Sequence, residues 1–370
     1  MMKIVVAIDK FKGSLSCFDA CKQIQNGIEK VRPSFNVVTF PMADGGDGFA
    51  QVLKHYLKTN TVWVNTVDPI HRKIKGYYEW NSAKKVAIIE LAVASGLVLL
   101  KNNKRNPLVT STLGTGILIQ HAIDKGAKKI ILGLGGSATN DGGMGIAHAL
   151  GFRFKDISGN QLAPSGAALV QIKHIEKPAK FKKINLVIAC DVNNPLCGKN
   201  GASYVYGPQK GASPKAVEFL DKGLKNLANV IYLHTGKKVA NILGVGAAGG
   251  VSAILNGYYN VKMMKGIDLV LQTSNITKSI QNADLLITGE GKIDNQSLSG
   301  KVVGSLVEMA KINATPVLLI AGIIDLPSKS ELKKLPIIQL ADKRHTIKYS
   351  ISNAAIILHS KVQDYFINMH

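Results

Sequence analysis

Short apolar runs, each followed at once by a turn of glycines and acidic or hydroxyl side chains, constrain the fold of this chain more than any other feature. Residues 3–8 lead into Asp9, residues 129–134 lead into a glycine-rich segment, and residues 186–190 lead into Asp191. Short apolar runs without polar alternation are typical of strands buried on both faces of a parallel sheet. Apolar residues at helical spacing follow several of these turns, so the sequence predicts repeated β-α units.

The first forty residues form one such unit in this interpretation. After the apolar run, apolar side chains recur three or four residues apart from Phe18 to Val31, which predicts an amphipathic helix. Ser14 or Ser16 is a suitable N-cap, and Pro33 ends the helix. We expect a second strand at residues 36–40 and another helix up to residue 57.

The chain is long enough for two domains. Its 370 residues compare with about 150 for a typical domain. Residues 61–67, 74–80 and 85–90 resemble strands in a different arrangement, and late in the chain residues 283–321 again read as β-α-β. The prediction is an α/β protein of two unlike domains. Residues 1–75 plus 285–370 would form a doubly wound Rossmann- or flavodoxin-like parallel sheet, and residues 76–284 a second α/β domain.

Composition excludes some classes of protein. Apolar residues make up 46% of the chain, too many for a disordered protein. The net charge of +22 would suit a partner such as nucleic acid or an anionic membrane, but no run of five basic residues occurs and aromatic residues are only 6%. We therefore expect neither partner, and interpret the charge as a diffuse basic surface that attracts small anions.

The cysteines and the start of the chain indicate a soluble cytoplasmic protein. Four cysteines without a C-x-x-C pair are not a disulfide framework and suit a reducing compartment. The apolar run before Asp9 is too short for a signal peptide, and the longest apolar stretch, residues 86–100, is interrupted by Glu90. That stretch is also shorter than the ~20 residues that cross a bilayer.

Five turns carry residues suited to chemistry. The first, residues 9–14, brings Lys12 to a helix N-terminus, which favours anions. The second, residues 41–48, places two aspartates among three glycines. The third, residues 133–143, holds five glycines and four small polar residues. It matches neither a Walker A loop nor G-x-G-x-x-G, because Ala138 stands at the third glycine position, so it predicts an anion-binding loop of another kind.

The remaining two turns add carboxylates. Asp191 follows a buried run directly, a position suited to a catalytic base or a metal ligand, although an Asx-turn explains it as well. Residues 288–294 bring Glu290, Lys292 and Asp294 into what reads as one turn. Mg²⁺ in phosphotransfer sites takes one or two carboxylates plus phosphate oxygens, and this segment could supply them.

Taken together, anion loops, lysines and surplus carboxylates favour phosphoryl transfer, which needs positioning, charge neutralisation, a metal and a base. Hydride transfer needs no such surplus of acids. Hydrolysis through a nucleophile would want a histidine, and none of the nine histidines lies in these turns. A dinucleotide-dependent oxidoreductase and a nucleic-acid-binding protein remain as the rival hypotheses.

At these turns the chain resembles the bacterial glycerate kinase family, which includes the glycerate 2-kinases. The matching strings are DKFKGSLS, PMADGGDG, NPLVTSTLGTG, GLGGSATNDGG, ACDVNNPLCGKNGAS, GPQKGA, GAAGG and ITGEGKIDNQSLSGK, in this order. The sequence departs from the usual pattern at Lys10, where serine is common, at Asp47, where glutamate is common, and at Lys292, which replaces a frequent arginine.

The resemblance implies two unlike α/β domains with the active site in the cleft between them. It also implies ATP-dependent phosphorylation of D-glycerate with Mg²⁺, with the 2-phosphate favoured as product. A 3-phosphate product, or another small hydroxy-acid as substrate, stays open. The oligomeric state is also open, and a homodimer is one option.

The roles hypothesised for individual residues follow the five turns. Asp191 is the expected base, with Asp44 in reserve, and Lys12 and Ser14 hold the substrate carboxylate or the transferring phosphate. Lys10, Asp47 and Asn193 complete the substrate site. The nucleotide phosphates are assigned to the glycine-rich loop, at Gly135, Gly136, Ser137, Thr139 and Asn140. Mg²⁺ is assigned to Glu290, Asp294 and Asp141.

Overall fold

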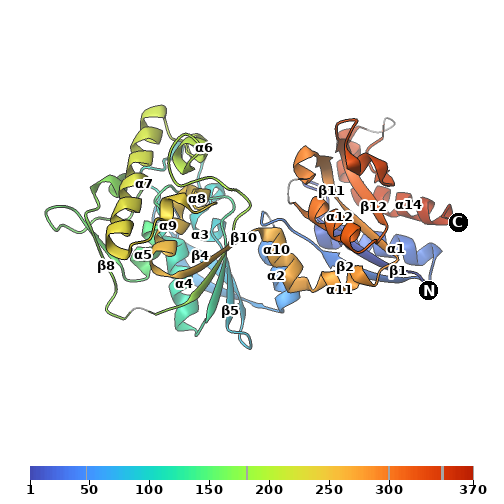
Figure 1. Cartoon of the computed structure of the whole chain (residues 1–370), viewed down its shortest axis with the longest axis horizontal. Coiled ribbons are helices and arrows are strands. Elements are labelled where there is room, and N and C mark those ends of the chain that lie inside the picture. Colours follow the sequence, from blue (N-terminus) through green and yellow to red (C-terminus); the bar gives the residue numbers. More distant parts are fainter. Residues whose placement is uncertain (47, 181, 299–300, 343–345, 370) are drawn as a thin grey trace. The chain divides into compact units, whose positions relative to one another are not determined.

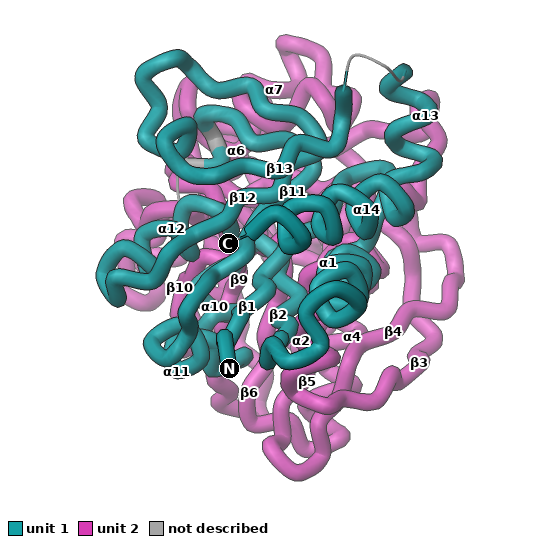
Figure 2. Tube along the Cα trace, turned by 90° about the vertical axis from the view of Figure 1, so that its right-hand side faces the viewer, with its two compact units in different colours: residues 1–44, 267–370 teal, residues 45–266 magenta. Residues whose placement is uncertain are grey.

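The computed structural model describes residues 1–46, 48–180, 182–298, 301–342 and 346–369. The chain divides into two compact units, shown in two colours in Figure 2. Unit 1 comprises residues 1–44 and 267–370, and unit 2 comprises residues 45–266. Both units contain a sheet with helices packed on it (Figure 1). No helix among the described residues is long and apolar enough to cross a membrane.

Unit 1 is built on a five-stranded sheet in which every neighbouring pair is parallel. Its strands are β1 (Lys3–Ile8), β2 (Asn36–Pro41), β11 (Leu285–Asp294), β12 (Val317–Asp325) and β13 (Ile337–Gln339). The spatial order is β13-β12-β11-β1-β2. Counted along unit 1 alone, this is the 2-1-3-4-5 order of doubly wound flavodoxin-like sheets, whose switch point lies between β1 and β11.

Helices cover both faces of this sheet. They are α1 (Cys17–Val31), α10 (Gly266–Ser274), α11 (Ile276–Gln281), α12 (Val302–Ile312), α13 (Ile347–Ser352) and α14 (Ala354–Ile367). Alternate residues of β1 pack with α1 and α14 in one core. The residues between them, Val5 and Ala7, are equally buried, and α12 lies against β1 and β11. Burial on both faces explains why β1 reads as an unbroken apolar run.

Helix α1 confirms the helical spacing seen in the sequence. It begins after Ser16, whose side chain accepts the Asp19 N–H, so Ser16 rather than Ser14 is the N-cap. The face that carries Ala20, Cys21, Ile24 and Ile28 is buried. Gly27 lets α1 approach α14 closely, because a Cβ at this position would lie 3.0 Å from the His359 carbonyl oxygen.

Unit 2 contains a mixed six-stranded sheet in the order β10-β9-β6-β5-β4-β3. The strands are β3 (Asn60–Val67), β4 (Lys73–Asn81), β5 (Val86–Glu90), β6 (Lys129–Gly133), β9 (Asn185–Ala189) and β10 (Asn260–Met264). β5, β6, β9 and β10 run parallel, whereas β3 and β4 form an antiparallel extension. A separate short hairpin is formed by β7 (Arg153–Lys155) and β8 (His174–Glu176).

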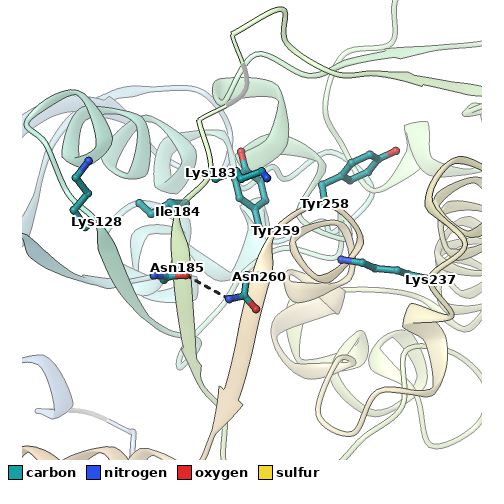
Figure 3. Close-up of a pocket in the computed structure, with 8 residues that line it drawn as sticks. All are labelled: Lys128, Lys183, Ile184, Asn185, Lys237, Tyr258, Tyr259 and Asn260. Atoms are coloured by element: carbon teal, nitrogen blue, oxygen red, sulfur yellow. Dashed lines mark hydrogen bonds between the residues drawn. The ribbon is translucent and has the colours of Figure 1, made fainter.

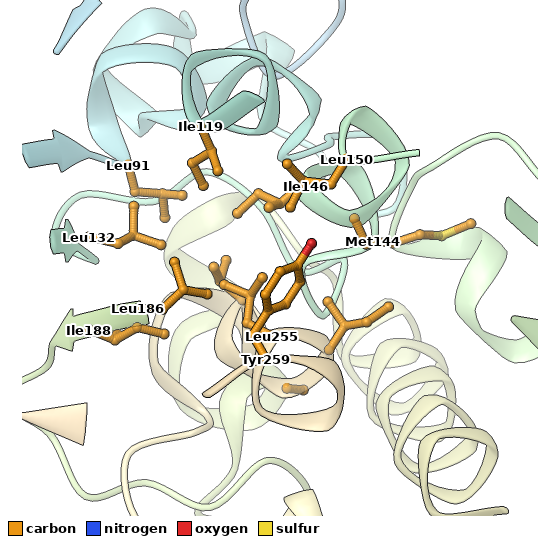
Figure 4. Close-up of a cluster of buried hydrophobic side chains, with 14 of the residues drawn as sticks. Leu91, Ile119, Leu132, Met144, Ile146, Leu150, Leu186, Ile188, Leu255 and Tyr259 are labelled. Carbon is orange, nitrogen blue, oxygen red and sulfur yellow. The ribbon is translucent and has the colours of Figure 1, made fainter. Parts of the chain in front are cut away.

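The helices of unit 2 enclose one large apolar core. They are α2 (Phe49–Leu57), α3 (Ala92–Ser95), α4 (Leu113–Asp124), α5 (Met144–Ala149), α6 (Ala202–Tyr206), α7 (Pro214–Thr235), α8 (Ala247–Gly250) and α9 (Ser252–Tyr258). Figure 4 shows side chains of the central strands, such as Leu132 and Ile188, meeting side chains from α4, α5 and α9. This core holds the carboxyl ends of β6 and β9 in place.

The boundaries between the units differ from those expected from the sequence. Residues 45–75 lie in unit 2, because β3 pairs with β4 along its whole length, from Asn60 opposite Trp80 to Val67 opposite Lys73. Residues 267–284 lie in unit 1, where α11 contacts α12. Unit 2 is therefore inserted between β2 and β11.

Candidate active site

Three carboxylates gather near the level at which β1 and β2 end, while β11 continues further. Asp9 follows β1, Asp44 follows β2, and Glu290 lies near the middle of β11. Asp9 and Glu290 belong to the two strands that flank the switch point, where open α/β sheets bind their ligands. Asp44 and Glu290 both act on Asp9 electrostatically, and Asp44 also acts on Glu290. The sequence assigned roles to Asp44 and Glu290 but missed Asp9.

Asp9 is a strongly perturbed carboxyl. Its side chain is 6% exposed. Burial raises its pKa to about 7, and the nearby charge of Asp44 contributes to the rise. The Lys10 N–H, which donates to Asp9 Oδ1 at 2.7 Å, acts in the opposite direction. The sequence feature that could have indicated Asp9 as a candidate is its position directly after an apolar strand.

Glu290 has an oxygen suited to a cation. Burial raises the pKa of Glu290, whereas a hydrogen bond from Ser297 and the charge of Lys301 lower it. Its Oε1 atom is buried and has no hydrogen-bond partner among the described residues. Ser297 Oγ also accepts the N–H of Asp294 at 3.0 Å, so one hydroxyl links the two acids assigned to Mg²⁺. An unpartnered carboxylate oxygen beside a second carboxylate fits Mg²⁺, which prefers oxygen ligands.

The segment that carries these acids is a strand and not the turn that the sequence suggested. β11 continues to Asp294, and Lys292, Ile293 and Asp294 pair with residues 323–325 of β12. Gly289 makes this pairing possible, because a Cβ there would overlap the Ile320 carbonyl oxygen. Two glycines among polar residues normally indicate a turn, which is why the sequence misled. Lys292 forms an ion pair with Asp325 at 2.7 Å.

The turn between β1 and α1 carries the residues proposed for the substrate. Lys12 is exposed, and Lys10 and Ser14 are half-buried. Ser14 Oγ donates to the Phe11 carbonyl at 3.1 Å, which closes the turn. Asp47, which was also assigned to the substrate, lies outside the described residues.

In unit 2 the glycine-rich loop between β6 and α5 has an exposed tip and a buried stem. Gly135 and Gly136 are exposed, whereas Ser137, Thr139 and Asn140 are buried. None of the hydrogen bonds among the described residues uses the N–H groups of Gly135, Gly136 or Ser137. Gly136 adopts a φ of +68°, which helps consecutive N–H groups to converge. These unpaired N–H groups make the tip a candidate anion-binding nest.

Polar atoms without hydrogen-bond partners lie in the buried stem of this loop. Thr139 Oγ1 and Asn140 Oδ1 are buried, and no described residue bonds to them. Asn140 is anchored on its other side, where Nδ2 donates to Ser203 Oγ at 3.1 Å. Unsatisfied buried polar groups are rare in native proteins and call for an explanation such as a ligand.

Asp141, assigned to Mg²⁺ from the sequence, has a different environment. It is fully buried, and its Oδ2 accepts the N–H groups of Thr112 at 2.8 Å and Gly145 at 3.1 Å. Its Oδ1 accepts the Gly143 N–H at 3.2 Å. Burial raises the pKa of Asp141, and these bonds lower it. The carboxylate therefore caps N–H groups at the start of α5. Because its oxygens are already used as acceptors, Asp141 is not among the Mg²⁺ ligands proposed below.

Lys210 contacts the same loop and was not assigned any role from the sequence. It is 2% exposed, and its Nζ donates to Ser137 Oγ at 2.9 Å and to the Thr139 carbonyl at 2.7 Å. Burial lowers the pKa of Lys210 to about 7. The residue lies in the quoted string GPQKGA, but a lysine in a loop is normally exposed, so residue type alone gave no signal.

Asp191 lies against the first and the last residue of unit 2. It follows β9, and its Oδ1 accepts the N–H of Gly266, the last residue of unit 2, at 2.8 Å. Gly45, the first residue of unit 2, lies against Asp191 so closely that a Cβ on Gly45 would overlap Oδ2. Asp191 and Asn193 are both exposed. The structure therefore places the expected base at the carboxyl end of the unit 2 sheet.

A separate hollow lies at the opposite end of the unit 2 sheet. It has a volume of about 600 Å³ and is lined by residues that include Lys128, Asn185 and Asn260 (Figure 3). Asn185 and Asn260 are the first residues of β9 and β10, whereas the glycine-rich loop and Asp191 follow the last residues of β6 and β9. None of the sequence-predicted site residues lines this hollow.

Within each unit, then, the structure groups site residues at the carboxyl end of the sheet. Unit 1 brings together Asp9, Asp44 and Glu290, and unit 2 brings Lys210 to the glycine-rich loop. Among the described residues no three histidine, cysteine or acidic side chains form a metal-binding group. Mg²⁺ that arrives with a nucleotide needs fewer protein ligands, since phosphate oxygens and waters complete its shell.

Comparison with known proteins decides the family. Residues 4–368 match the glycerate kinase family. This chain belongs to the glycerate kinase family. A glycerate kinase of Halalkalibacterium halodurans is 42% identical over 87% of this chain and 86% of its own length. A glycerate 2-kinase of Escherichia coli K12 is 40% identical over 87% of this chain and 85% of its own.

A solved structure agrees with this placement. The crystal structure of a protein assigned as glycerate kinase 2 from Salmonella typhimurium LT2 superposes with a TM-score of 0.85 at 34% identity. The alignment covers 99% of this chain and 97% of that one. The α/β fold class inferred from the sequence is confirmed, and the chain is an enzyme of the kinase type.

Proposed function

We propose that this enzyme transfers the terminal phosphoryl group of ATP to the 2-hydroxyl of D-glycerate and releases ADP and 2-phosphoglycerate. The observation that carries the proposal is the match to the glycerate kinase family over residues 4–368. The glycerate 2-kinase among the relatives supports position 2. The reaction would serve the breakdown of glycerate, glyoxylate or sugar acids in the cytoplasm.

The two units supply complementary parts in this proposal. The exposed tip of the glycine-rich loop, Gly135 and Gly136, binds nucleotide phosphates through its unpaired N–H groups. Lys12 and Ser14, in the turn before α1, bind the substrate carboxylate or the transferring phosphate. Lys10, Asp47 and Asn193 are proposed as further substrate contacts.

A carboxylate must take the proton of the attacking hydroxyl. We assign this role to Asp191, whose Oδ1 is oriented by the Gly266 N–H. As the proton leaves, the glycerate oxygen bonds to the terminal phosphorus of ATP, and the bond from that phosphorus to the bridging oxygen breaks. Asp44 is the reserve candidate, because it also lies at a strand tip.

Mg²⁺ is the proposed metal, held by Glu290 and Asp294. The unpartnered Oε1 of Glu290 supports this assignment. When bound, the ion neutralises phosphate charge that would otherwise repel the attacking oxygen. Glu290 and Asp294 would hold this ion at the carboxyl end of the unit 1 sheet.

Enolase provides a test of both the activity and the position of the phosphate. D-glycerate, ATP and Mg²⁺ are incubated with the enzyme, and enolase is added without a phosphoglycerate mutase. Only 2-phosphoglycerate is a direct enolase substrate, so formation of phosphoenolpyruvate supports the proposal. A product that reaches enolase only after mutase is added would move the phosphate to position 3 and contradict the assignment.

A further inference from the structure

Lys210 is the one buried lysine in the part of the chain that the structure describes. It ends a short 3-10 turn, Pro208–Lys210, and its side chain points into unit 2 toward the glycine-rich loop. Gly211, with a φ of +90°, closes the turn against the Arg105 carbonyl, where a Cβ would not fit. The backbone therefore holds the lysine in this inward position.

The ammonium of Lys210 lacks the partner that buried charges normally have. Three other buried charges of unit 2 form ion pairs, namely Asp68 with Arg72, Glu79 with Lys54, and Asp221 with Lys225. Among the described residues no carboxylate lies within ion-pair distance of Lys210. A buried charge without a paired opposite charge is costly, so its presence needs a reason other than stability.

The contacts of Lys210 supply that reason. Its two hydrogen bonds, to Ser137 Oγ and to the Thr139 carbonyl, hold residues 137–139 from below. Ser137 Oγ in turn bonds to the Ala248 carbonyl at 3.1 Å, so the loop is also tied to a second glycine-rich segment. Directly above, the N–H groups of Gly135, Gly136 and Ser137 have no acceptor among the described residues. Lys210 thus contacts the same loop that carries these three N–H groups.

We propose that Lys210 is a positioning residue that shapes the tip of the glycine-rich loop into an anion nest, and that its charge is neutralised by the phosphate groups bound there. Lys210 does not touch the reacting atoms, because it lies beneath the loop. The identity of the anion, a nucleoside triphosphate, rests on the proposed function. The existence of an anion site at the loop does not.

Proton uptake follows from this arrangement. Burial lowers the pKa of Lys210 to about 7, and Asp141, the titratable group that acts on it, opposes the shift. Near neutral pH the free protein therefore holds this lysine only partly charged. An anion bound above it favours the charged form, so binding takes up protons and weakens as the pH rises above 7.

The test compares Lys210→Met with Lys215→Met, a matched change of an exposed lysine in the first turn of α7. Calorimetry measures binding of tripolyphosphate and of ATP in two buffers of different ionisation enthalpy. Loss of a charge-assisted contact predicts about 10- to 100-fold weaker binding and no proton uptake for Lys210→Met. Lys215→Met should bind like the wild type. In the kinase assay, KM for ATP should rise more than kcat falls.

Thermal stability separates positioning from a purely structural role. Because the buried charge is costly, Lys210→Met should melt at the same temperature as the wild type or higher. Unchanged affinity, unchanged proton uptake, or weaker binding together with a large fall in Tm would overturn the proposal. If Lys210→Met does not fold, Ser137→Ala decides instead: weaker binding at unchanged Tm supports the proposal, and unchanged binding overturns it.

Failure of the proposal for Lys210 can be distinguished from failure of the proposed kinase function. Wild-type protein that binds tripolyphosphate but does not phosphorylate glycerate would remove the proposed function and leave the role of Lys210 intact. Wild-type protein that binds neither tripolyphosphate nor ATP would overturn the role of Lys210.

Discussion

Asp191 is the proposed general base, so the proposal depends on this side chain more than on any other. Replacing it with asparagine keeps the acceptor for the Gly266 N–H but removes the ability to take a proton. A general base typically contributes roughly 100- to 10,000-fold in rate, so Asp191→Asn should lower kcat by at least that lower figure. The melting temperature should stay close to that of the wild type. Near-normal turnover in a steady-state assay would remove Asp191 from this role and direct attention to Asp44.

Asp9 makes stability depend on pH in a defined direction. Its pKa is raised from 3.8 to about 7 in the folded chain, so between these values the folded state binds more protons than the unfolded state. Stability from this group is therefore present below pH 4 and is lost as the pH rises through 7.

Asp9→Asn removes this loss, because the amide stays neutral and its oxygen can still accept the Lys10 N–H. Urea unfolding in the presence of a chelator should show Asp9→Asn gaining stability over the wild type at pH 8, with a smaller gain at pH 5. An equal difference at both pH values would show that Asp9 titrates normally.

At this scale the sequence indicated some of the residues that the structure groups at the strand ends, and gave no indication of others. Glu290 and Asp44 could be predicted because acids directly after or within an apolar strand lie at the carboxyl edge of a parallel sheet. Lys210 could not, because its burial results from the turn at Gly211 and from packing against a loop about seventy residues earlier in the chain. Asp141 stays a prediction as a metal ligand, and its hydrogen bonds to backbone N–H groups could not be foreseen because a capping carboxylate and a metal ligand look alike in sequence.

Helices and strands with a regular pattern of apolar residues were predictable, whereas the structure of glycine-rich segments was not. β1 and α1 follow from uninterrupted burial and from three-and-four spacing. β11 extends beyond its apolar run because Gly289 allows β12 to approach, a property of two strands that are separate in sequence. The domain boundary shifted for a similar reason, since the pairing of β3 with β4 outweighs the proximity of β3 to the first β-α unit in the chain.

The contact between Gly45, in the turn after β2, and the Asp191 carboxylate can be tested with a matched control. Gly45 has a φ of +100° and lies against the Asp191 carboxylate, while Gly126 has a φ of +98° and nothing within 4 Å of its Cβ position. Both alanine variants carry the same left-handed strain of about 1–2 kcal/mol. Only Gly45→Ala should also displace Asp191 and lower kcat, by tenfold or more. If the two variants keep equal kcat, this contact does not matter for catalysis.

At the scale of the whole molecule, the proposal requires both units to act on one pair of substrates. Closure that excludes water is the usual means by which kinases protect ATP from hydrolysis. Small-angle scattering should therefore show a smaller radius of gyration with D-glycerate and a non-hydrolysable ATP analogue together than with either ligand alone. Identical scattering in all states would contradict closure as part of the reaction.

Unit 2 is inserted in the chain between β2 and β11 of unit 1. A discontinuous organisation could be predicted from the sequence because β-α-β patterns occur at both ends of the chain. It could not give the strand order, which depends on which long-range pairs form.

Phosphorus NMR tests the central claim most directly. A mixture of ATP, D-glycerate, Mg²⁺ and enzyme should develop one phosphomonoester signal in equal amount to the ADP formed, and omission of glycerate should abolish both. ADP accompanied only by inorganic phosphate, or no consumption of ATP at all, would contradict phosphoryl transfer to glycerate by this chain.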